Sequence, residues 1–250
     1  MNNAKWISYF TRNRAHRLEP DWSSPMTVPP DVLPPLLKSI EQFRLGDGGG
    51  PASLIAYDAH RFRNRSEEMR TIVDLWFGEE AEHARLLGCA VKRFNGRYIT
   101  SHWSFTAFCF CRRIFGVRFE LQVLLLTELV STAYYRLLRN HSPDAALTAM
   151  CELILRDEAG HVAFHRDRLA DRDGAAKGLR GLLWQAQFRL FGYAAATMLW
   201  VNHRPGLTAI GGSGLEYFME VRRQLQRFIF SLRRAAAPVR VQAQWAAGAI

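Results

Sequence analysis

Two glutamates and a histidine interrupt the apolar stripe of a helix predicted over residues 66–94, in the stretch GEEAEHARLLG. A bundle helix turns its buried face inward at positions spaced alternately four and three residues apart. On that spacing Glu80 and His83 fall on the buried face, between Trp76 and Leu87. A lone carboxylate buried in an apolar core is unstable as an anion. The stretch therefore indicates a chemical role for both side chains.

The same ExxH spacing recurs once more, and two further acids fall on buried faces. Glu158 and His161 occupy equivalent positions in a helix predicted over residues 143–169. Glu128 lies inside the apolar run LQVLLLTELV, and Asp47 falls on the buried face of the first bundle helix. A single ExxH pattern is weak, since any helix surface can carry it. Two of them with matched carboxylates are typical of a metal site.

The predicted hairpin turns give a separate test of this grouping, because residues equidistant from a turn lie at the same level of a bundle. Glu128 and Glu158 are centred on one predicted turn, and Asp47 and Glu80 are centred on the other. Glu41 is the competing acid of the first helix. It falls off the buried face and about 9 Å from the level of Asp47, at 1.5 Å per residue. Asp47 is therefore preferred over Glu41.

Six side chains are thus predicted to converge: Asp47, Glu80, His83, Glu128, Glu158 and His161. Four carboxylates and two neutral imidazoles suit two divalent first-row metals, because four negative charges cancel four positive charges in a low-dielectric core. Oxygen-rich ligation with one nitrogen per metal favours iron or manganese. The order of metal affinities leaves zinc and copper open.

Helical periodicity with almost no alternating pattern predicts an all-α fold. The bundle helices are expected at about residues 36–60, 66–94, 115–139 and 143–169. The first and last connections are short, whereas the aromatic segment between the second and third helices is long, as a ferritin-like four-helix bundle with a crossover requires. Ser142 is expected to cap the fourth helix, with Pro143 as its first residue.

The whole chain divides into three predicted parts. Residues 1–34 are rich in proline towards their end and are expected to form an extended arm, and residues 35–170 form the bundle with its dinuclear site. Residues 171–250 form a C-terminal extension packed on the bundle. It has one helix near 175–201, another that opens at a capping box from Ser213 to Glu216, and a frayed tail from Ala235. A chain of 250 residues fills one core and does not require two.

Composition adds weaker indications. The formal net charge of +10 predicts an acidic partner or carrier, or simply a solvated basic surface, and the basic runs would also suit nucleic acid or anionic lipid. The N-terminus lacks an apolar signal region, which predicts a cytoplasmic protein. Polar residues interrupt the most apolar window, 182–200, so a packed helix is expected and not a membrane span. The four cysteines lack CxxC spacing and are expected to be buried.

The motifs EEAEH and DEAGH resemble the two ExxH motifs of the ferritin-like di-iron carboxylate superfamily, over about residues 36–170. In bacterial ferritin-like domain proteins the first helix ends in a phrase such as FQLGE, whose glutamate binds metal. The phrase here is FRLGD, so the resemblance assigns that ligand to Asp47. It implies two iron ions, with manganese or a mixed pair as the alternative. Asp47 is shorter than glutamate, and GGGP follows it, which predicts a kink at the ligand.

The resemblance also implies acids that hydrogen-bond the ligands. Asp157 and Glu79 directly precede the ligand glutamates, and Asp157 is expected to accept the free N–H of a ligand histidine, with His83 as the candidate. For Glu79 the alternative is a charge on a solvated helix face.

Three more side chains on buried faces have open roles. His165 lies one turn beyond His161 and is either an extra ligand, a proton carrier or a hydrogen-bonded core histidine. Tyr135 and Tyr57 are either hydrogen-bond donors near the ligands, redox-active groups, or packed core residues with satisfied hydroxyls.

The function implied by the resemblance is a di-iron oxidase or oxygenase that activates dioxygen to oxidise an unidentified small or carrier-bound substrate. An electron donor would be its partner, and a homodimer is compatible with the sequence. One alternative is an iron-handling ferroxidase or store, against which the basic charge and the two extra helices stand. Another is a helical scaffold whose site has decayed at Asp47.

Overall fold

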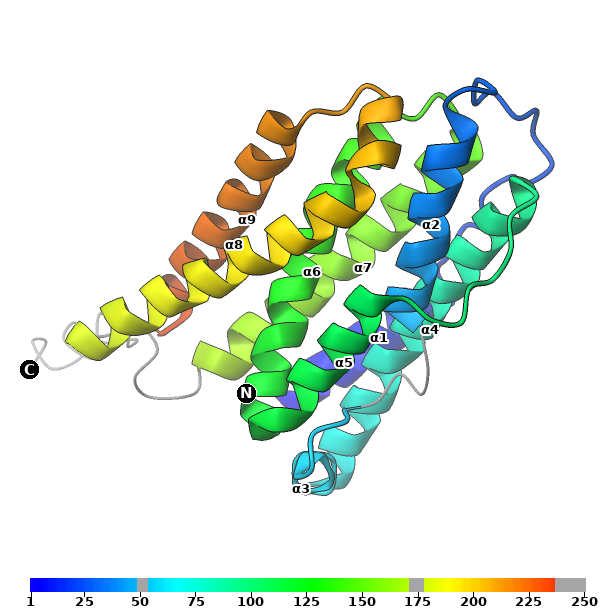
Figure 1. The fold of residues 1–250 in the computed structure, drawn as a ribbon. Helices are drawn as coiled ribbons and strands as arrows, with labels where there is room; N and C mark the ends of the chain where they lie inside the picture. Colours follow the sequence, from blue (N-terminus) through cyan, green and yellow to red (C-terminus); the bar gives the residue numbers. More distant parts are fainter. Residues whose placement is uncertain (49–53, 171–177, 237–250) are drawn as a thin grey trace, which may run out of the picture.

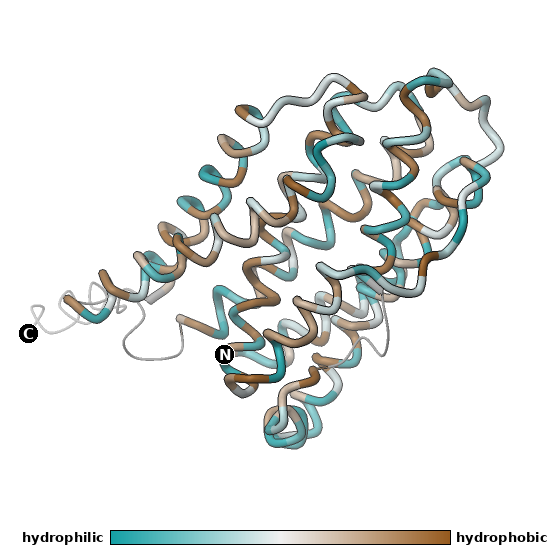
Figure 2. Tube along the Cα trace, viewed as in Figure 1, coloured by the Kyte–Doolittle hydropathy of each residue, from teal (hydrophilic) through white to brown (hydrophobic). Residues whose placement is uncertain are grey.

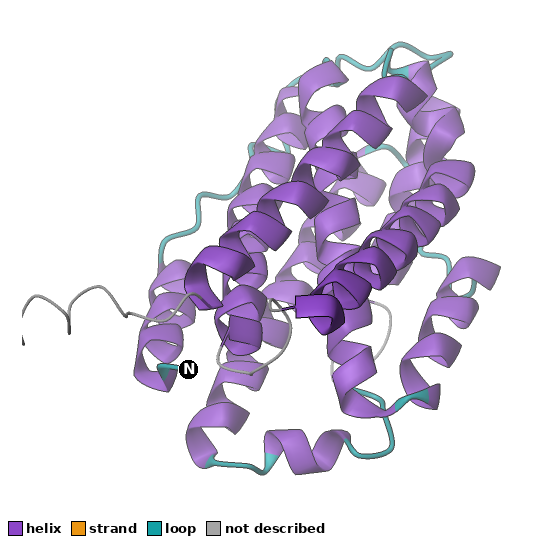
Figure 3. Cartoon of the chain, turned by 90° about the vertical axis from the view of Figure 1, so that its left-hand side faces the viewer, coloured by secondary structure: helices purple, strands orange, loops and turns teal. Residues whose placement is uncertain are grey.

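Four long helices surround the acidic and histidine residues in the computed structural model, which describes residues 1–48, 54–170 and 178–236 (Figure 1). They pair as α2 with α4 and α6 with α7, and α4 also packs on α7. Their bounds are Leu33–Gly48 for α2, Glu67–Arg93 for α4, Gly116–His141 for α6 and Ala145–Ala170 for α7. The regular structure within these described ranges is entirely helical (Figure 3), which confirms the all-α prediction.

Within the described residues, five further helices pack around these four. The two C-terminal helices lie side by side: α8 packs on α2 and α6, and α9 packs on α6 and α7. On other faces α1 packs against α4, α3 against α4 and α6, and α5 against α6. Their bounds are Asn3–Ala15 for α1, Ala59–Arg63 for α3, Trp103–Ile114 for α5, Gly178–Ala209 for α8 and Gly214–Ala236 for α9.

Helix α4 matches its prediction closely. Ser66 is the N-cap, and its side chain accepts a hydrogen bond from the Met69 N–H. Phe94 is the C-cap. Glu67 and Glu68 lie in the first turn, where the helix dipole favours negative charge. The expected helix over 66–94 is therefore confirmed.

The prediction that residues 1–34 form an extended arm is wrong for their first half, which is helix α1. The Asn2 side chain caps it by accepting a hydrogen bond from the Lys5 N–H. Trp6 and Phe10, one turn apart, are buried and pack against Phe164 of α7. This apolar pair lies well before the first proline, so nothing in the local sequence breaks the helix.

The first bundle helix ends earlier than predicted. Gly48 is the last described residue of α2 and residues 54–58 are not helical, whereas the prediction extended the helix to about residue 60. Glycine and proline favour termination there, because glycine loses most conformational entropy in a helix and proline lacks the N–H donor. The expected kink at Pro51 lies outside the described residues. The long connection after α4 also differs from its prediction, since it contains helix α5.

The cap of helix α7 is Asp144, not Ser142. The Leu147 N–H donates to Asp144 Oδ1 at 3.0 Å, whereas Ser142 is the C-cap of α6 and its Oγ accepts the Asp144 N–H. The Asp144 carboxylate is favoured as the cap because it also forms a buried ion pair with Arg93, at 2.8 Å. Ser213 does cap α9, since its Oγ accepts the Glu216 N–H at 3.2 Å.

The remaining predictions for the C-terminal part are met in part. Helix α8 runs eight residues past the expected end at Val201, through Pro205. Its expected start at residue 175 and most of the tail after Ala235 lie outside the described residues. No helix within the described ranges is long and apolar enough to cross a membrane.

The buried apolar side chains form two clusters along the bundle. Hydrophobic and hydrophilic residues alternate along the helices (Figure 2), as expected for helices with one buried face. On α4 the residues up to Phe77 belong to one cluster and those from Leu86 onward to the other. On α7 the boundary falls between Ile154 and Phe164. The two ExxH motifs occupy these boundaries, so their side chains lie at one level between two apolar halves.

Replacing the buried Asp144 tests how strongly the pair with Arg93 supports the fold. Asp144→Ala leaves a guanidinium buried and uncompensated, and we expect a loss of about 3–5 kcal/mol in unfolding free energy. Asp74→Ala is the control, because it breaks the exposed pair with Arg63 and should cost at most about 1 kcal/mol. Urea denaturation measures both. Similar losses in the two variants would contradict this role.

Candidate metal centre

The six side chains grouped by sequence come together between the apolar halves. Glu80, Glu128 and His161 each offer a ligand atom, and these atoms lie within 4.8 Å of one another. Glu158 Oε2 lies 3.8 Å from His161 Nδ1. The remaining two flank this group: His83 Nδ1 is 3.7 Å from Glu80 Oε2, and Asp47 lines the same cavity as the glutamates. Four different helices therefore contribute to one cluster.

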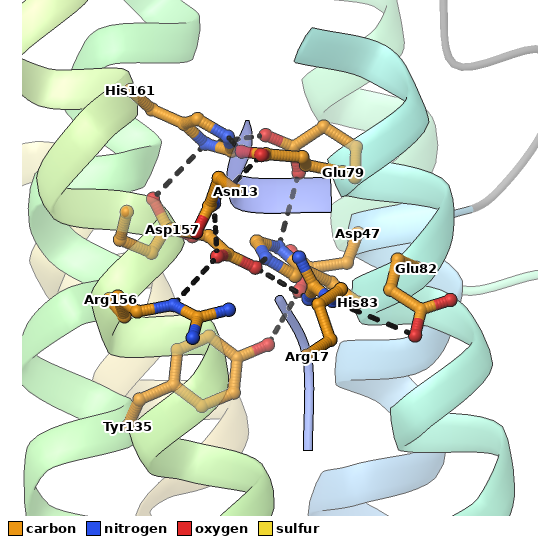
Figure 4. Close-up of polar contacts among 12 residues, drawn as sticks. Asn13, Arg17, Asp47, Glu79, Glu82, His83, Tyr135, Arg156, Asp157 and His161 are labelled. Atoms are coloured by element: carbon orange, nitrogen blue, oxygen red, sulfur yellow. Dashed lines mark hydrogen bonds and ion pairs between the residues drawn. The ribbon is translucent and has the colours of Figure 1, made fainter. Parts of the chain in front are cut away.

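The outer contacts of both motif histidines fix their tautomers. His83 Nε2 lies 3.0 Å from Asp157 Oδ2, and His161 Nε2 lies 3.0 Å from Glu79 Oε2 (Figure 4). An ionised carboxylate only accepts hydrogen bonds, so in the neutral form of each ring Nε2 carries the proton and Nδ1 has the lone pair. In both rings Nδ1 faces the cluster. The pairing of Asp157 with His83 is the one expected from the sequence, and Glu79 takes the corresponding position for His161.

The N-terminal segment holds these two acids from outside. Asn13 Nδ2 donates to Glu79 Oε1 at 2.8 Å and to Asp157 Oδ1 at 2.7 Å, and Arg17 donates to Asp157 Oδ2 at 2.6 Å (Figure 4). Helix α1 can approach α7 because Gly160 has no side chain: a Cβ there would lie 2.3 Å from the Tyr9 hydroxyl oxygen. Sequence reasoning overlooked Asn13 and Arg17, since no local motif links them to acids so distant in the chain.

Several buried atoms of the cluster have no hydrogen-bond partner among the described residues. They are Glu128 Oε1 and Oε2, Glu158 Oε2, and Nδ1 of both His83 and His161. His161 Nδ1 lies 3.0 Å from Glu80 Oε1 but without hydrogen-bond geometry. Leaving a buried polar group unsatisfied costs about 1–3 kcal/mol. Cations would satisfy all of these atoms at once, so the donor set fits a metal centre.

The pKa shifts within the cluster indicate which of its side chains bind protons when no cation is bound. Burial and the neighbouring Glu80 raise the pKa of Glu158 to about 8 and that of Asp47 to about 6. Burial acts to lower the pKa of His83, but hydrogen bonds to Asp157 and Glu80 raise it to about 10. Protons thus occupy positions that a cation would take, and metal binding to such ligands releases protons.

His165 is hydrogen-bonded through Nδ1 to Arg168, and its Nε2 lies beside the cluster without a hydrogen-bond partner among the described residues. Arg168 Nη2 lies 3.1 Å from His165 Nδ1, and a guanidinium only donates, so Nδ1 must accept. The proton of the neutral ring is therefore on Nε2, which lies 3.4 Å from Glu128 Oε1. Burial lowers the pKa of His165, which favours this neutral form. Of the three roles left open by the sequence, the geometry favours the hydrogen-bonded core histidine.

The structure places Tyr135 beside Asp47, whereas Tyr57 lies on the surface. Tyr135 is buried, and its hydroxyl donates to Asp47 Oδ2 at 2.5 Å, which orients that carboxylate. The expectation that Tyr57 lies near the ligands is wrong, because this side chain is 85% exposed. Its assignment assumed that α2 continues through residue 57, but residues 54–58 are not helical. The competing acid Glu41 accepts the backbone N–H of Arg97 at 2.8 Å and does not join the cluster.

Comparison with protein-family models, curated proteins and solved structures found no match for this chain. Its class is therefore defined by its own geometry: an all-helical fold with a buried cluster of carboxylates and histidines between two apolar halves. The cysteines take no part in the cluster, and the expectation that all are buried is wrong, since Cys111 is exposed. Cys111 lies on α5, the helix that the sequence did not reveal.

Metal content distinguishes a ligand from a hydrogen-bond donor among the histidines of α7. His161→Ala removes a candidate ligand atom, and we expect it to reduce the iron(II) retained after anaerobic loading at least twofold. His165→Gln keeps an N–H donor near Glu128, and we expect it to retain iron near the wild-type level. Elemental analysis of desalted protein measures both. Equal losses would identify His165 as a further ligand.

Proposed function

We propose that this protein is a ferritin-like dinuclear-metal oxidoreductase that uses two iron ions. The observation that carries the proposal is the set of carboxylate oxygens and imidazole Nδ1 atoms that are buried at one level of the bundle without a hydrogen-bond partner among the described residues. Four helices in two antiparallel pairs, joined by the long segment that contains α5, are compatible with a ferritin-like arrangement.

The ligands divide into two groups by helix pair. Asp47, Glu80 and His83 from α2 and α4 would hold one ion, and Glu128, Glu158 and His161 from α6 and α7 would hold the other. Glu80 has an oxygen within 4 Å of Nδ1 in both histidines, so it is placed to be shared. When bound, a pair of ferrous ions supplies the electrons that reduce dioxygen and so permits oxidation of a substrate beside them.

The surrounding residues hold the ligands and exclude water. Asp157 and Glu79 keep the histidines in the tautomer that binds metal. Trp76 Nε1 donates to Glu80 Oε1 at 3.2 Å, and its ring packs edge-on against His165 with centroids 5.0 Å apart. Phe164 packs on the same tryptophan. Such an apolar wall strengthens electrostatic interactions within the cluster and limits side reactions with water.

Anaerobic iron loading followed by exposure to oxygen tests the proposal. We expect about two iron ions per chain, and an optical and Mössbauer spectrum that changes on oxygen addition. Metal content below one ion per chain, even with metal supplied, would indicate a scaffold with a decayed site. Continued uptake of iron by a many-subunit shell on size-exclusion chromatography would indicate storage.

A pair of variants tests the ligand assignment itself. Glu158→Ala removes a buried carboxylate from the cluster and should reduce bound iron at least twofold. Glu41→Ala is the matched control, because Glu41 is an acid of α2 that bonds to Arg97 instead. It should keep iron near the wild-type level. Loss of iron in Glu41→Ala would reverse the assignment of the α2 ligand to Asp47.

A further inference from the structure

A cavity of about 480 Å³ adjoins the candidate metal centre. Its lining comes from α2, α4, α5, α6, α7 and α8, and it includes Asp47, Glu80, Glu128 and Glu158. A molecule in this cavity therefore contacts the metal ligands directly. The volume is within the usual range for small-molecule sites, about 300–1,000 Å³.

Most of the remaining lining is apolar. It includes six phenylalanines: Phe43, Phe77, Phe105, Phe108, Phe119 and Phe191. Arg112 also lines the cavity, but its charge is paired with Glu120 at 2.8 Å. His203 is neutral, because burial lowers its pKa to about 3. Outside the candidate metal ligands, the charge that lines the cavity is that of Arg112, and it is paired.

The cavity is elongated along two neighbouring helices. Phe119 of α6 contacts Phe191 of α8 at one end, with ring centroids 6.1 Å apart. At the other end Phe43 contacts His203, with centroids 4.9 Å apart. The lining runs from residue 119 to 131 on α6 and from 191 to 203 on α8, about 18 Å of each helix at 1.5 Å per residue. A space of this length suits a chain better than a compact ring.

Solvent reaches the cavity between α5 and α8. Among its lining residues, Cys111 on α5 and Phe191 and Ala194 on α8 are exposed, whereas Glu128 and Glu158 are buried. The ligands from α6 and α7 are therefore buried, whereas exposed lining residues lie on α5 and α8 and, at Gly46 beside Asp47, on α2. A substrate can leave a polar end group in water between α5 and α8 while its apolar part extends inward.

We propose that the substrate carries a long aliphatic chain, which the cavity binds beside the metal ligands. The inference rests on the proposed function for its chemistry, but binding of the chain does not require metal. A free fatty acid and an acyl group attached to a carrier share this chain. These two sources are distinguished by comparing how strongly dodecanoate and dodecanoyl pantetheine displace a bound fluorescent fatty acid.

The test measures chain binding by the metal-free full-length protein, so its outcome is independent of iron loading. Displacement of cis-parinaric acid, a fluorescent fatty acid, reports the affinity of saturated acids from eight to sixteen carbons. We expect affinity to rise about fourfold per added CH₂, equivalent to about 0.8 kcal/mol, until the cavity is filled. Displacement that does not depend on chain length, or equal displacement by naphthalene, would overturn the proposal.

Two cavity variants and a control locate the binding. Ala107 on α5 and Ala194 on α8 line the cavity, and tryptophan at either position should weaken binding at least tenfold. Ala235→Trp is the control, because this exposed alanine at the end of α9 lies outside the lining. Circular dichroism checks the fold of each variant. Ala194 is exposed, so Ala194→Trp keeps the test informative if Ala107→Trp disturbs α5. Wild-type affinity in the folded variants would contradict chain binding in this cavity.

Discussion

The electrostatic cost of burying acids constrains the rest of this molecule. A carboxylate in a low-dielectric interior must be protonated, paired or bound to a cation. Glu128 and Glu158 are buried, with oxygens that have no hydrogen-bond partner among the described residues. Every helix that supplies such an acid must therefore present it at the same level as the others, where one set of positive charges can neutralise them all.

This constraint explains why the ligands have such defined outer contacts. An imidazole binds a cation only through a lone pair, and the proton position decides which nitrogen has it. Asp157 and Glu79 set that position in His83 and His161. The same reasoning separates His165 from the other two, since the guanidinium of Arg168 places the proton on the nitrogen that faces the cluster. In their neutral forms, two of the three histidines thus present a lone pair to the cluster and the third presents an N–H.

Much of this arrangement was predictable from helical spacing. The 3.6-residue period placed both ExxH motifs on buried faces, and distances from the turns grouped the four acids. What failed depended on contacts between distant segments. The prolines that follow α1 favour an extended arm over residues 1–34, so the sequence does not reveal this helix. The Asn13 side chain bonds to acids 66 and 144 residues away, which no local pattern can predict. The prediction for Tyr57 is wrong because residues 54–58 are not helical, so the helical spacing that placed Tyr57 on a buried face does not apply there.

The double contact of Asn13 couples the two halves of the cluster. One amide nitrogen donates to both Glu79 and Asp157, and each of these acids orients a different histidine. Any displacement of α1 consequently alters both imidazoles together. The last turn of α1 is thereby linked to both imidazoles through one side chain, so a substitution of Asn13 would affect His83 and His161 together.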